Sequence, residues 1–254
     1  MRAVKNAIKL ALTAVGYDIR PLQSPFALAR EWTYAEASDD EIALVKRFMP
    51  YSMTGPRRQW VLLRAAAYVD RFNIAGDIAE CGVYRAGNIL LLKARASVRE
   101  RRYYLYDTFA GMSEPTEVDV ARWGEVASTT HAVHQRETHN DWVFASIAEV
   151  KGNFRRFGLL DDDLVFIPGK VEETLLIEKN LPKQLAILRL DTDWYQSTKI
   201  EMEVLYPRLV RGGILIIDDY GDWAGSRKAV DEYFVDAAPL LIPIDEGCRI
   251  AIKP

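Results

Sequence analysis

The chain is poor in cysteine and histidine, and it lacks both a long apolar run and a strong charge of either sign. Its 254 residues include two cysteines, Cys81 and Cys248, so we expect no disulfide framework and no zinc site. No stretch approaches the roughly 18 apolar residues of a membrane span. Lysine plus arginine (33) nearly balance aspartate plus glutamate (36). This balance predicts no nucleic-acid partner, because phosphate-binding surfaces usually carry a basic excess.

The three histidines, His131, His134 and His139, fall close together in the chain. Their spacing fits one face of a helix, which allows either a metal site or contacts to a substrate. No cysteine and no second group of ligands accompanies them, so we favour a structural or substrate-contact role.

The amino terminus has a basic start and a short apolar stretch, but no small-residue cleavage site follows it. Apolar Val4, Ile8, Leu12 and Val15 recur at helical spacing, which predicts an amphipathic helix over residues 1–17. We expect this helix to dock on the protein or in a dimer interface of a homo-oligomer, with contact to a membrane surface as the alternative. In the absence of a signal peptide, the predicted location is the cytoplasm.

The pattern of apolar residues changes near residue 75. Before this point apolar positions recur at helical spacing. Asp39 or Asp40 is expected to cap a helix over Glu41–Arg47, and Pro56 to begin another that runs to Phe72. After residue 75, short apolar runs alternate with helical patterns, which is typical of βαβ units around a parallel sheet.

We therefore expect a helical extension over residues 1–75 and an α/β domain over residues 76–254. Seven apolar runs predict its strands, and they span Asp77–Cys81, Tyr103–Asp107, Leu164–Ile167, Leu185–Leu190, Ile214–Ile217, Leu240–Ile244 and Arg249–Ile252. The helices predicted between them span Gly87–Arg102, Trp142–Arg156, Glu172–Leu181, Ser197–Val210 and Gly225–Val235. The polar stretch over residues 112–140 is long for a loop and predicts a lid or a binding loop.

A tight turn at residues 245–247 joins the last two predicted strands, so this pair forms an antiparallel hairpin. A Rossmann-like, mostly parallel sheet that ends in one antiparallel hairpin resembles the layout of the S-adenosylmethionine (SAM)-dependent methyltransferase fold. We expect that α/β fold here, with seven strands and additional amino-terminal helices.

A glycine-bearing turn, from Glu80 to Gly87, follows the first predicted strand. Gly82 and Gly87 let the backbone turn tightly and let a ligand approach where a side chain would clash. A plain strand-to-helix turn explains the two glycines equally well. Asp107 ends the second strand about 20 residues later, where a carboxylate can accept hydrogen bonds from ribose hydroxyls.

A third element, Gly169 with Lys170, closes the next strand at the same edge of the sheet. Ligands of open α/β sheets bind beyond the carboxyl ends of the strands, where the strand order reverses. The three elements therefore predict a nucleoside site. A dinucleotide would also fit, but the antiparallel end of the sheet favours SAM.

Acidic residues follow two further strands. Asp191 and Asp193 end the fourth strand, and Asp218 and Asp219 end the fifth. Clustered like charges repel one another unless a cation neutralises them, and carboxylate oxygens suit Mg²⁺, Mn²⁺ or Ca²⁺ better than zinc. The alternative is that Asp193 and Asp219 cap the helices that follow them.

A metal ion at this edge has a definable task. It can bind a substrate hydroxyl, lower the pKa of that hydroxyl and orient it toward a methyl donor. A nearby base must then accept the proton. Asp193 is the first candidate for this base, and His139 or His134 from the polar stretch is the second.

Six segments of the chain resemble the macrocin O-methyltransferase family, which methylates sugars of macrolides and aminocoumarins. They read GDIAECGVYRAG, YLYDTFAGM, FIPGKVEETL, LAILRLDTDWYQST, LYPRLVRGGILIIDDY and RKAVDEYF, and together they span residues 76–234. The resemblance implies that Asp191, Asp218 and Asp219 hold Mg²⁺ and that Asp193 matches a base of one branch. The macrolide branch has a histidine where this chain has Trp194, which argues against a macrolide substrate.

The resemblance also implies SAM contacts at Glu80, Gly82, Asp107 and the segment near Gly169, and it brings Thr54 toward the cofactor. With their neighbours in the same motifs, the predicted cofactor site comprises Thr54, Glu80, Gly82, Tyr84, Arg85, Gly87, Asp107, Thr108, Gly169, Lys170 and Asp191. The implied acceptor is a sugar hydroxyl of a natural-product glycoside or a polysaccharide. Aromatic residues available for stacking on a sugar are Trp123, Trp142, Trp194 and Tyr220, although each is equally suited to a core.

Two other functions are compatible with the same residues. A catechol or other phenolic O-methyltransferase uses a similar metal geometry, but its flat substrates need an apolar slot, whereas the stretch over residues 112–140 is polar. The second alternative is a non-catalytic SAM-binding scaffold. Such a scaffold has no need for the clustered carboxylates of Asp191, Asp218 and Asp219.

Overall fold

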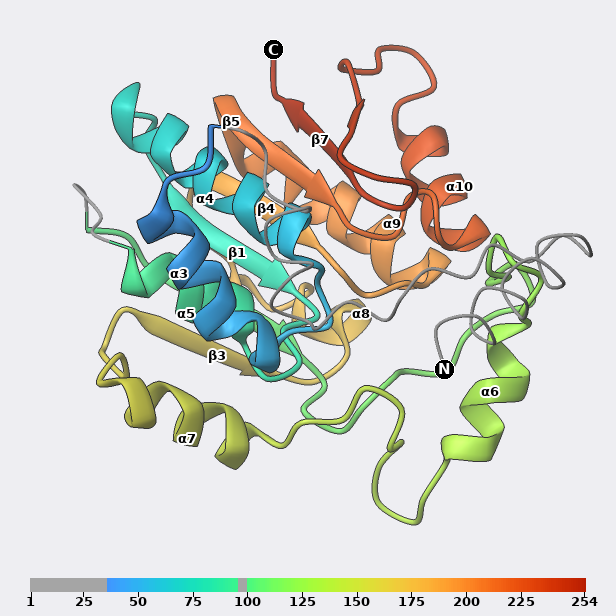
Figure 1. The fold of residues 1–254 in the computed structure, drawn as a ribbon. Coiled ribbons are helices and arrows are strands. Elements are labelled where there is room, and N and C mark those ends of the chain that lie inside the picture. The colour runs from blue at the N-terminus through green and yellow to red at the C-terminus, as the bar shows by residue number, and fades with distance from the viewer. Residues whose placement is uncertain (1–35, 96–99) are drawn as a thin grey trace, which may run out of the picture.

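A mixed sheet forms the centre of the computed structural model, which describes residues 36–95 and 100–254 (Figure 1). Its strands are β1 (Asp77–Cys81), β2 (Tyr103–Asp107), β3 (Leu164–Pro168), β4 (Leu185–Leu190), β5 (Leu209–Ile217), β6 (Ile242–Pro243) and β7 (Arg249–Ile252). The strand order is β3-β2-β1-β4-β5-β7-β6. The first five strands are parallel, and β7 lies antiparallel between β5 and β6. The predicted fold is therefore confirmed.

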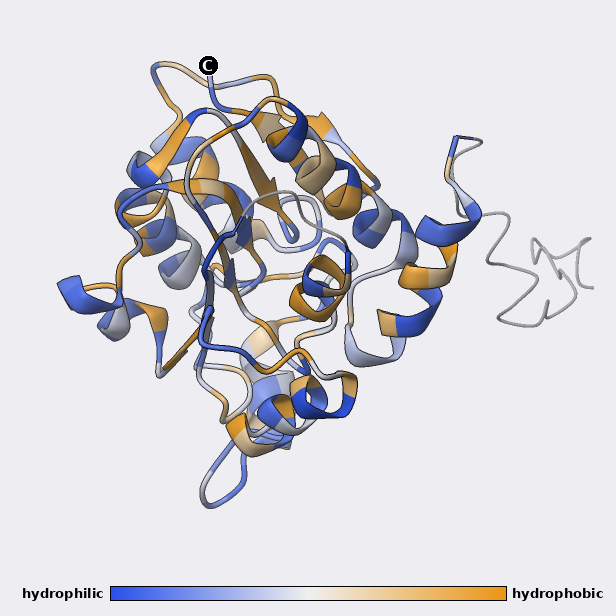
Figure 2. Cartoon of the chain, turned by 90° about the vertical axis from the view of Figure 1, so that its left-hand side faces the viewer, coloured by the Kyte–Doolittle hydropathy of each residue, from blue (hydrophilic) through white to orange (hydrophobic). Residues whose placement is uncertain are grey.

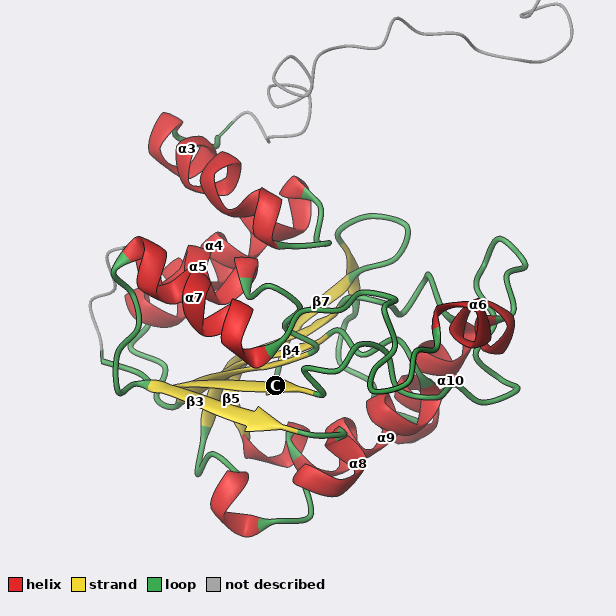
Figure 3. Cartoon of the chain, turned by 90° about the horizontal axis from the view of Figure 1, so that it is seen from below, coloured by secondary structure: helices red, strands yellow, loops and turns green. Residues whose placement is uncertain are grey.

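Helices cover both faces of this sheet (Figure 3). One face carries α3 (Asp39–Phe48), α4 (Pro56–Arg71), α5 (Gly87–Ala94) and α7 (Ile147–Phe157), and their buried residues form one apolar core with the sheet. The other face carries α8 (Val171–Thr174), α9 (Tyr195–Val204) and α10 (Ala224–Tyr233) around a second core. Short 3-10 turns span Met49–Tyr51, Glu178–Asn180 and Tyr206–Arg208. Apolar colour runs through the central strands, whereas the helices show polar outer sides (Figure 2).

Several predicted boundaries were wrong for local reasons. The predicted helix from Gly87 ends at Ala94, because Arg95 has extended backbone angles. The helix predicted from Trp142 begins only at Ile147, where Ser146 caps it through the Glu149 N–H. The helices predicted over Glu172–Leu181 and Ser197–Val210 each break into an α-helix and a 3-10 turn. The predicted helix over residues 1–17 lies outside the described residues.

The start of α3 differs from the prediction in a similar way. Its cap is Ser38, whose hydroxyl accepts from the Glu41 N–H while the Glu41 carboxylate accepts from the Ser38 N–H. This reciprocal pair leaves Asp39 and Asp40 in the first turn, where their charges complement the helix dipole. Neither aspartate is the cap that the sequence predicted.

The stretch over residues 112–140 contains the helix α6 (Ala127–His134), which stands apart from the two helix layers (Figure 1). Asp119 attaches this stretch to the body of the protein. It is fully buried, and its carboxylate accepts from the Tyr195 N–H at the start of α9 (2.8 Å) and from the N–H and hydroxyl of Thr116. The stretch thus joins the edge of the sheet that carries the predicted site.

Three tryptophans fill the space between this stretch and the sheet. Trp142, Trp194 and Trp223 pack with ring centroids 4.9–6.2 Å apart and form a small apolar cluster.

Among the described helices, none is long and apolar enough to span a membrane.

Candidate functional site

Parallel strands bring the predicted site residues to one edge of the sheet. Arg189 on β4 lies directly beside Glu80 on β1 and Ile216 on β5. Side chains two residues apart on a strand share a face. Asp191 and Asp218, each two residues further along, therefore emerge on the face that α4 covers, just past the strand ends.

A cavity of about 400 Å³ opens at this edge, where the strand order reverses between β1 and β4. Most of the predicted cofactor site lines it, namely Thr54, Gly82, Tyr84, Asp107, Thr108, Gly169, Lys170 and Asp191. The volume lies within the range usual for small-molecule sites, roughly 300–1,000 Å³. Glu80, Arg85 and Gly87 are not part of its wall. Arg85 pairs instead with Glu149 at 2.8 Å, with both side chains partly exposed.

The glycine-bearing turn is shaped by close contacts. Gly82 has φ +78°, and a Cβ there would lie 1.9 Å from the carbonyl oxygen of Asp191. Gly87 has an ordinary φ, but a Cβ would lie 2.7 Å from Ser52 Cβ. Both glycines thus permit contacts within the protein: Gly82 between β1 and β4, and Gly87 between α5 and the segment before α4.

Asp107 holds the same turn in place. Its Oδ2 accepts from the N–H groups of Val83 (2.8 Å) and Tyr84 (3.0 Å), and its Oδ1 accepts from Phe109 (2.7 Å). Burial raises the pKa of Asp107, and these backbone hydrogen bonds oppose the rise. The carboxylate lines the cavity while it fixes the turn.

Glu80 is buried beneath the cavity wall. Its Oε1 accepts from Asn88 Nδ2 and from Arg189 Nη1, both at 2.7 Å. Its Oε2 has no hydrogen-bond partner among the described residues. Burial raises the pKa of Glu80 to about 6, although the charge of Arg189 opposes the rise.

Three predicted metal ligands come together at the cavity. Asp191, Asp218 and Asp219 each offer one carboxylate oxygen, and these oxygens lie within 4.8 Å of one another. Burial raises the pKa of Asp191 and Asp219, and the neighbouring carboxylates add to the rise. Hard oxygen donors at this spacing fit a divalent cation such as Mg²⁺.

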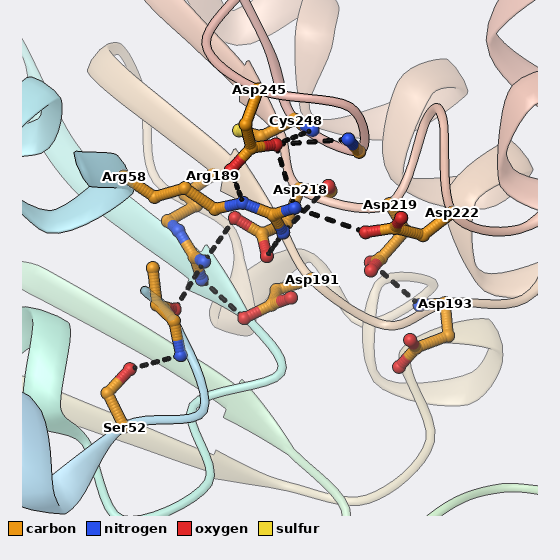
Figure 4. A network of polar contacts seen from close by, with 12 residues as sticks. Ser52, Arg58, Arg189, Asp191, Asp193, Asp218, Asp219, Asp222, Asp245 and Cys248 are labelled. Atoms are coloured by element: carbon orange, nitrogen blue, oxygen red, sulfur yellow. Dashed lines mark hydrogen bonds and ion pairs between the residues drawn. The ribbon is translucent and has the colours of Figure 1, made fainter. Parts of the chain in front are cut away.

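Two arginines that the sequence analysis missed lie among these carboxylates (Figure 4). Arg189 pairs with Glu80, Asp191 and Asp218, and its side chain is only 3% exposed. Burial opposes the ionisation of Asp218, but Arg189 and Arg58 together lower its pKa. A charged residue inside an otherwise apolar strand was the available signal, because a buried arginine requires partners.

Arg58, near the start of α4, shares Asp218 with Arg189 and pairs with two further carboxylates. It donates to Asp218 Oδ2 (2.6 Å), to both oxygens of Asp245 (2.7 and 2.9 Å) and to Asp222 (3.1 Å). Asp222 also accepts from Arg122 Nε (3.0 Å), in the stretch that bears α6. In this cluster the carboxylates outnumber the two guanidinium groups.

Asp193 lies on the cavity wall in a left-handed backbone conformation, with φ +68°. Its N–H points to Asp219 Oδ2 at 3.3 Å. Burial raises the pKa of its carboxyl to about 7, and hydrogen bonds with Asp219 and Trp223 oppose the rise. Trp194, not Asp193, is the N-cap of α9, so the helix-cap alternative does not describe this residue.

The histidines are not brought into the cavity wall. His139 Nδ1 lies 3.2 Å from Thr138 Oγ1, and its ring packs on Phe144 at 4.4 Å. His134 pairs with Asp141 at 2.7 Å. His131 contacts the Met112 carbonyl at 3.3 Å. Among the predicted bases, Asp193 is thus the one that lines the cavity.

Comparison with known proteins identifies the family of the chain. A family model described as Macrocin-O-methyltransferase (TylF) matches residues 29–246. The 8-demethyl-8-(2,3-dimethoxy-alpha-L-rhamnosyl)-tetracenomycin-C 4'-O-methyltransferase of Streptomyces olivaceus is 33% identical over 238 residues, which cover 90% of this chain and 83% of that protein. The demethyldecarbamoylnovobiocin O-methyltransferase of Streptomyces niveus is 36% identical over 201 residues, or 77% and 72% of the two chains.

A solved structure shares the fold. The structure of the O-methyltransferase NovP superposes with a TM-score of 0.68 and 33% identity, and the match covers 80% of this chain and 82% of that one. The family match spans most of the chain, and it includes the strand ends that line the cavity. The chain therefore belongs to the macrocin O-methyltransferase family and is a SAM-dependent O-methyltransferase.

Proposed function

We propose that this enzyme transfers the methyl group of SAM to a sugar hydroxyl of a glycoside, with a divalent cation held by Asp191, Asp218 and Asp219. The observation that carries the proposal is the convergence of these three carboxylates, within 4.8 Å, on the wall of a cavity that Asp193 also lines. The relatives support the choice of acceptor, since the Streptomyces olivaceus enzyme is named for a rhamnosyl-bearing compound.

The cavity suits SAM in its size and its polar groups. Asp107 and the turn after β1 line one side, in the arrangement expected for a nucleoside. Beneath this wall, Glu80 Oε2 is a buried acceptor with no partner among the described residues, as expected where the ammonium group of a ligand supplies one. Thr54 and Lys170 also line the cavity.

The chemistry then divides between the cation and the chain. A bound divalent ion supplies Lewis acidity, which lowers the pKa of a substrate hydroxyl. Asp193 receives the hydroxyl proton while the oxygen–methyl bond forms and the carbon–sulfur bond of the donor breaks, leaving S-adenosylhomocysteine. Asp193 lines the cavity beside the proposed metal ligands, and a carboxylate placed there can accept this proton. The cavity walls align the two substrates, which this in-line displacement requires.

Trp123 is the aromatic residue best placed for the sugar. It lines the cavity with 58% of its surface exposed, and its Nε1 donates to Glu125 Oε2 at 2.9 Å. Trp194 is 1% exposed and belongs to the core, and Trp142 packs against it. Tyr220 is not part of the cavity wall. Its hydroxyl donates to Asp231.

Removal of the cation is expected to stop turnover without removing the cofactor. Asp219→Asn keeps the shape of the side chain but removes one anionic ligand, and we expect turnover to fall on the order of 100-fold. S-adenosylhomocysteine production with a panel of glycosides and phenols, with and without chelator, measures this. Asp231→Asn, at an exposed carboxylate, is the matched control. Turnover that is indifferent to chelator and to Asp219→Asn would contradict the metal-assisted reaction.

Loss of the proposed base is expected to affect the chemical step alone. Asp193→Asn should lower kcat by roughly 10²- to 10⁴-fold, because the amide cannot accept the hydroxyl proton. Calorimetric affinities for S-adenosylhomocysteine and Mg²⁺ should stay within about threefold of the wild-type values. His139→Asn is the comparison. A larger loss of kcat in His139→Asn than in Asp193→Asn would indicate that His139, and not Asp193, is the base.

Truncation of Trp123 is expected to weaken the acceptor and spare the cofactor. Trp123→Ala should raise the acceptor KM about fivefold to tenfold, since one stacked aromatic contact contributes about 1 kcal/mol. The affinity for S-adenosylhomocysteine should not change. Val133→Ala, an exposed apolar residue of α6, serves as the control. If the acceptor KM is unchanged in Trp123→Ala, Trp123 does not contact the acceptor.

A further inference from the structure

The buried guanidinium group of Arg189 contacts both the cofactor side of the site and the proposed metal ligands. Arg189 Nη1 donates to Glu80 Oε1 (2.7 Å) and to Asp191 Oδ2 (2.5 Å). Its Nη2 donates to Thr54 Oγ1 (2.7 Å) and to Asp218 Oδ1 (2.6 Å). Each nitrogen therefore has one partner on the cofactor side and one partner among the proposed metal ligands.

The backbone fixes this arrangement. Glu80 and Arg189 are paired across β1 and β4, so their side chains meet on one face of the sheet. Asp191 follows Arg189 by two residues on that face, and Asp218 follows Ile216, the partner of Arg189 on β5. The guanidinium group is thus held among three neighbouring strands.

The cofactor side of this contact is itself cross-linked. Asn88 Nδ2 donates to Thr54 Oγ1 (3.0 Å) and to Glu80 Oε1 (2.7 Å), which are the two atoms that Arg189 contacts on this side. Residues from the segment before α4, from β1 and from α5 therefore form one buried unit. A shift of Arg189 is transmitted to this unit and to the metal ligands together.

We propose that Arg189 is a positioning residue that makes the binding of SAM and of the divalent cation cooperative. This inference rests on the cation site of the proposed function. The cofactor side uses Thr54 and Glu80, the cation uses Asp191 and Asp218, and Arg189 joins the two pairs. Binding of one ligand orders the contacts that the other requires, so the second ligand binds more tightly.

The forked shape of arginine is essential to this role. Two terminal nitrogens in a rigid plane can each contact two groups, whereas the ammonium of a lysine is a single point on a flexible stem. Arg189→Lys therefore keeps the buried positive charge but cannot span all four partners. It separates the bridging role from simple charge neutralisation.

Arg58 provides a matched control. It also donates to Asp218, at 2.6 Å, but its other side-chain partners recorded among the described residues are Asp222 and Asp245. None of these was predicted on the cofactor side of the site. Arg58→Lys should thus weaken the cation site and leave the cooperativity intact.

The experiment is a calorimetric double titration with S-adenosylhomocysteine and Mg²⁺. The demethylated product is the probe because it lacks the sulfonium charge, which would repel the cation directly. For the wild-type enzyme we expect saturating Mg²⁺ to raise the affinity for S-adenosylhomocysteine about fivefold to tenfold, and the reverse titration to give the same factor. In Arg189→Lys the factor should fall to about one, and in Arg58→Lys it should persist.

Thermal unfolding of each variant is measured beside the titration. If Arg189→Lys does not unfold cooperatively, Thr54→Val replaces it, because this change removes the hydroxyl that accepts from both Arg189 and Asn88 and should also reduce the factor. If Mg²⁺ does not change the affinity of the wild-type enzyme for S-adenosylhomocysteine, or if its effect is unchanged in Arg189→Lys, the inference is overturned. The proposed cation site is not affected by either result. Wild-type enzyme that binds S-adenosylhomocysteine but no Mg²⁺ overturns the proposed cation site, and the cooperativity with it.

Discussion

The burial of a guanidinium group among carboxylates is the constraint on which the site depends. Arg189 emerges from a strand whose other residues are all apolar, and its side chain is almost wholly inaccessible. Such a charge is tolerated only when partners surround it. Glu80, Asp191 and Asp218 supply that compensation, and the same contacts set the positions of the groups around the cavity.

The topology explains why these groups meet. Parallel strands deliver their carboxyl ends to one edge of the sheet, and the strand order reverses between β1 and β4, where the cavity opens. The part of the cavity suited to a nucleoside and the part suited to a cation therefore lie next to each other. The turn after β1 and Asp107 form the part suited to a nucleoside, and the ends of β4 and β5 form the part suited to a cation.

The sequence was sufficient to predict the sheet and its acidic edge, because both follow from local patterns. Apolar runs predicted the strands, and polar residues directly after those runs predicted Asp107, Asp191 and Asp218. Contacts between distant segments carried no such signal. Arg58 and Asp218 lie 160 residues apart, and no spacing in the chain connects them.

Local sequence pattern also failed to identify the cap of α3 and the contribution of residues 112–140 to the cavity. The helical pattern placed α3 and α4, but the choice of Ser38 over its acidic neighbours depends on a reciprocal hydrogen bond with Glu41. The clustered histidines suggested a catalytic contribution from the polar stretch. In the structure, His139 packs on Phe144, and this stretch contributes Met112, Ser113 and Trp123 to the cavity wall.

Crystals of the enzyme grown with S-adenosylhomocysteine and Mn²⁺ would test the central claim most directly, since the anomalous scattering of manganese locates the ion. We expect one ion about 2.1 Å from carboxylate oxygens of Asp191, Asp218 and Asp219, beside the bound nucleoside. A nucleoside in the cavity with no manganese at these carboxylates, or with manganese bound elsewhere, would contradict it.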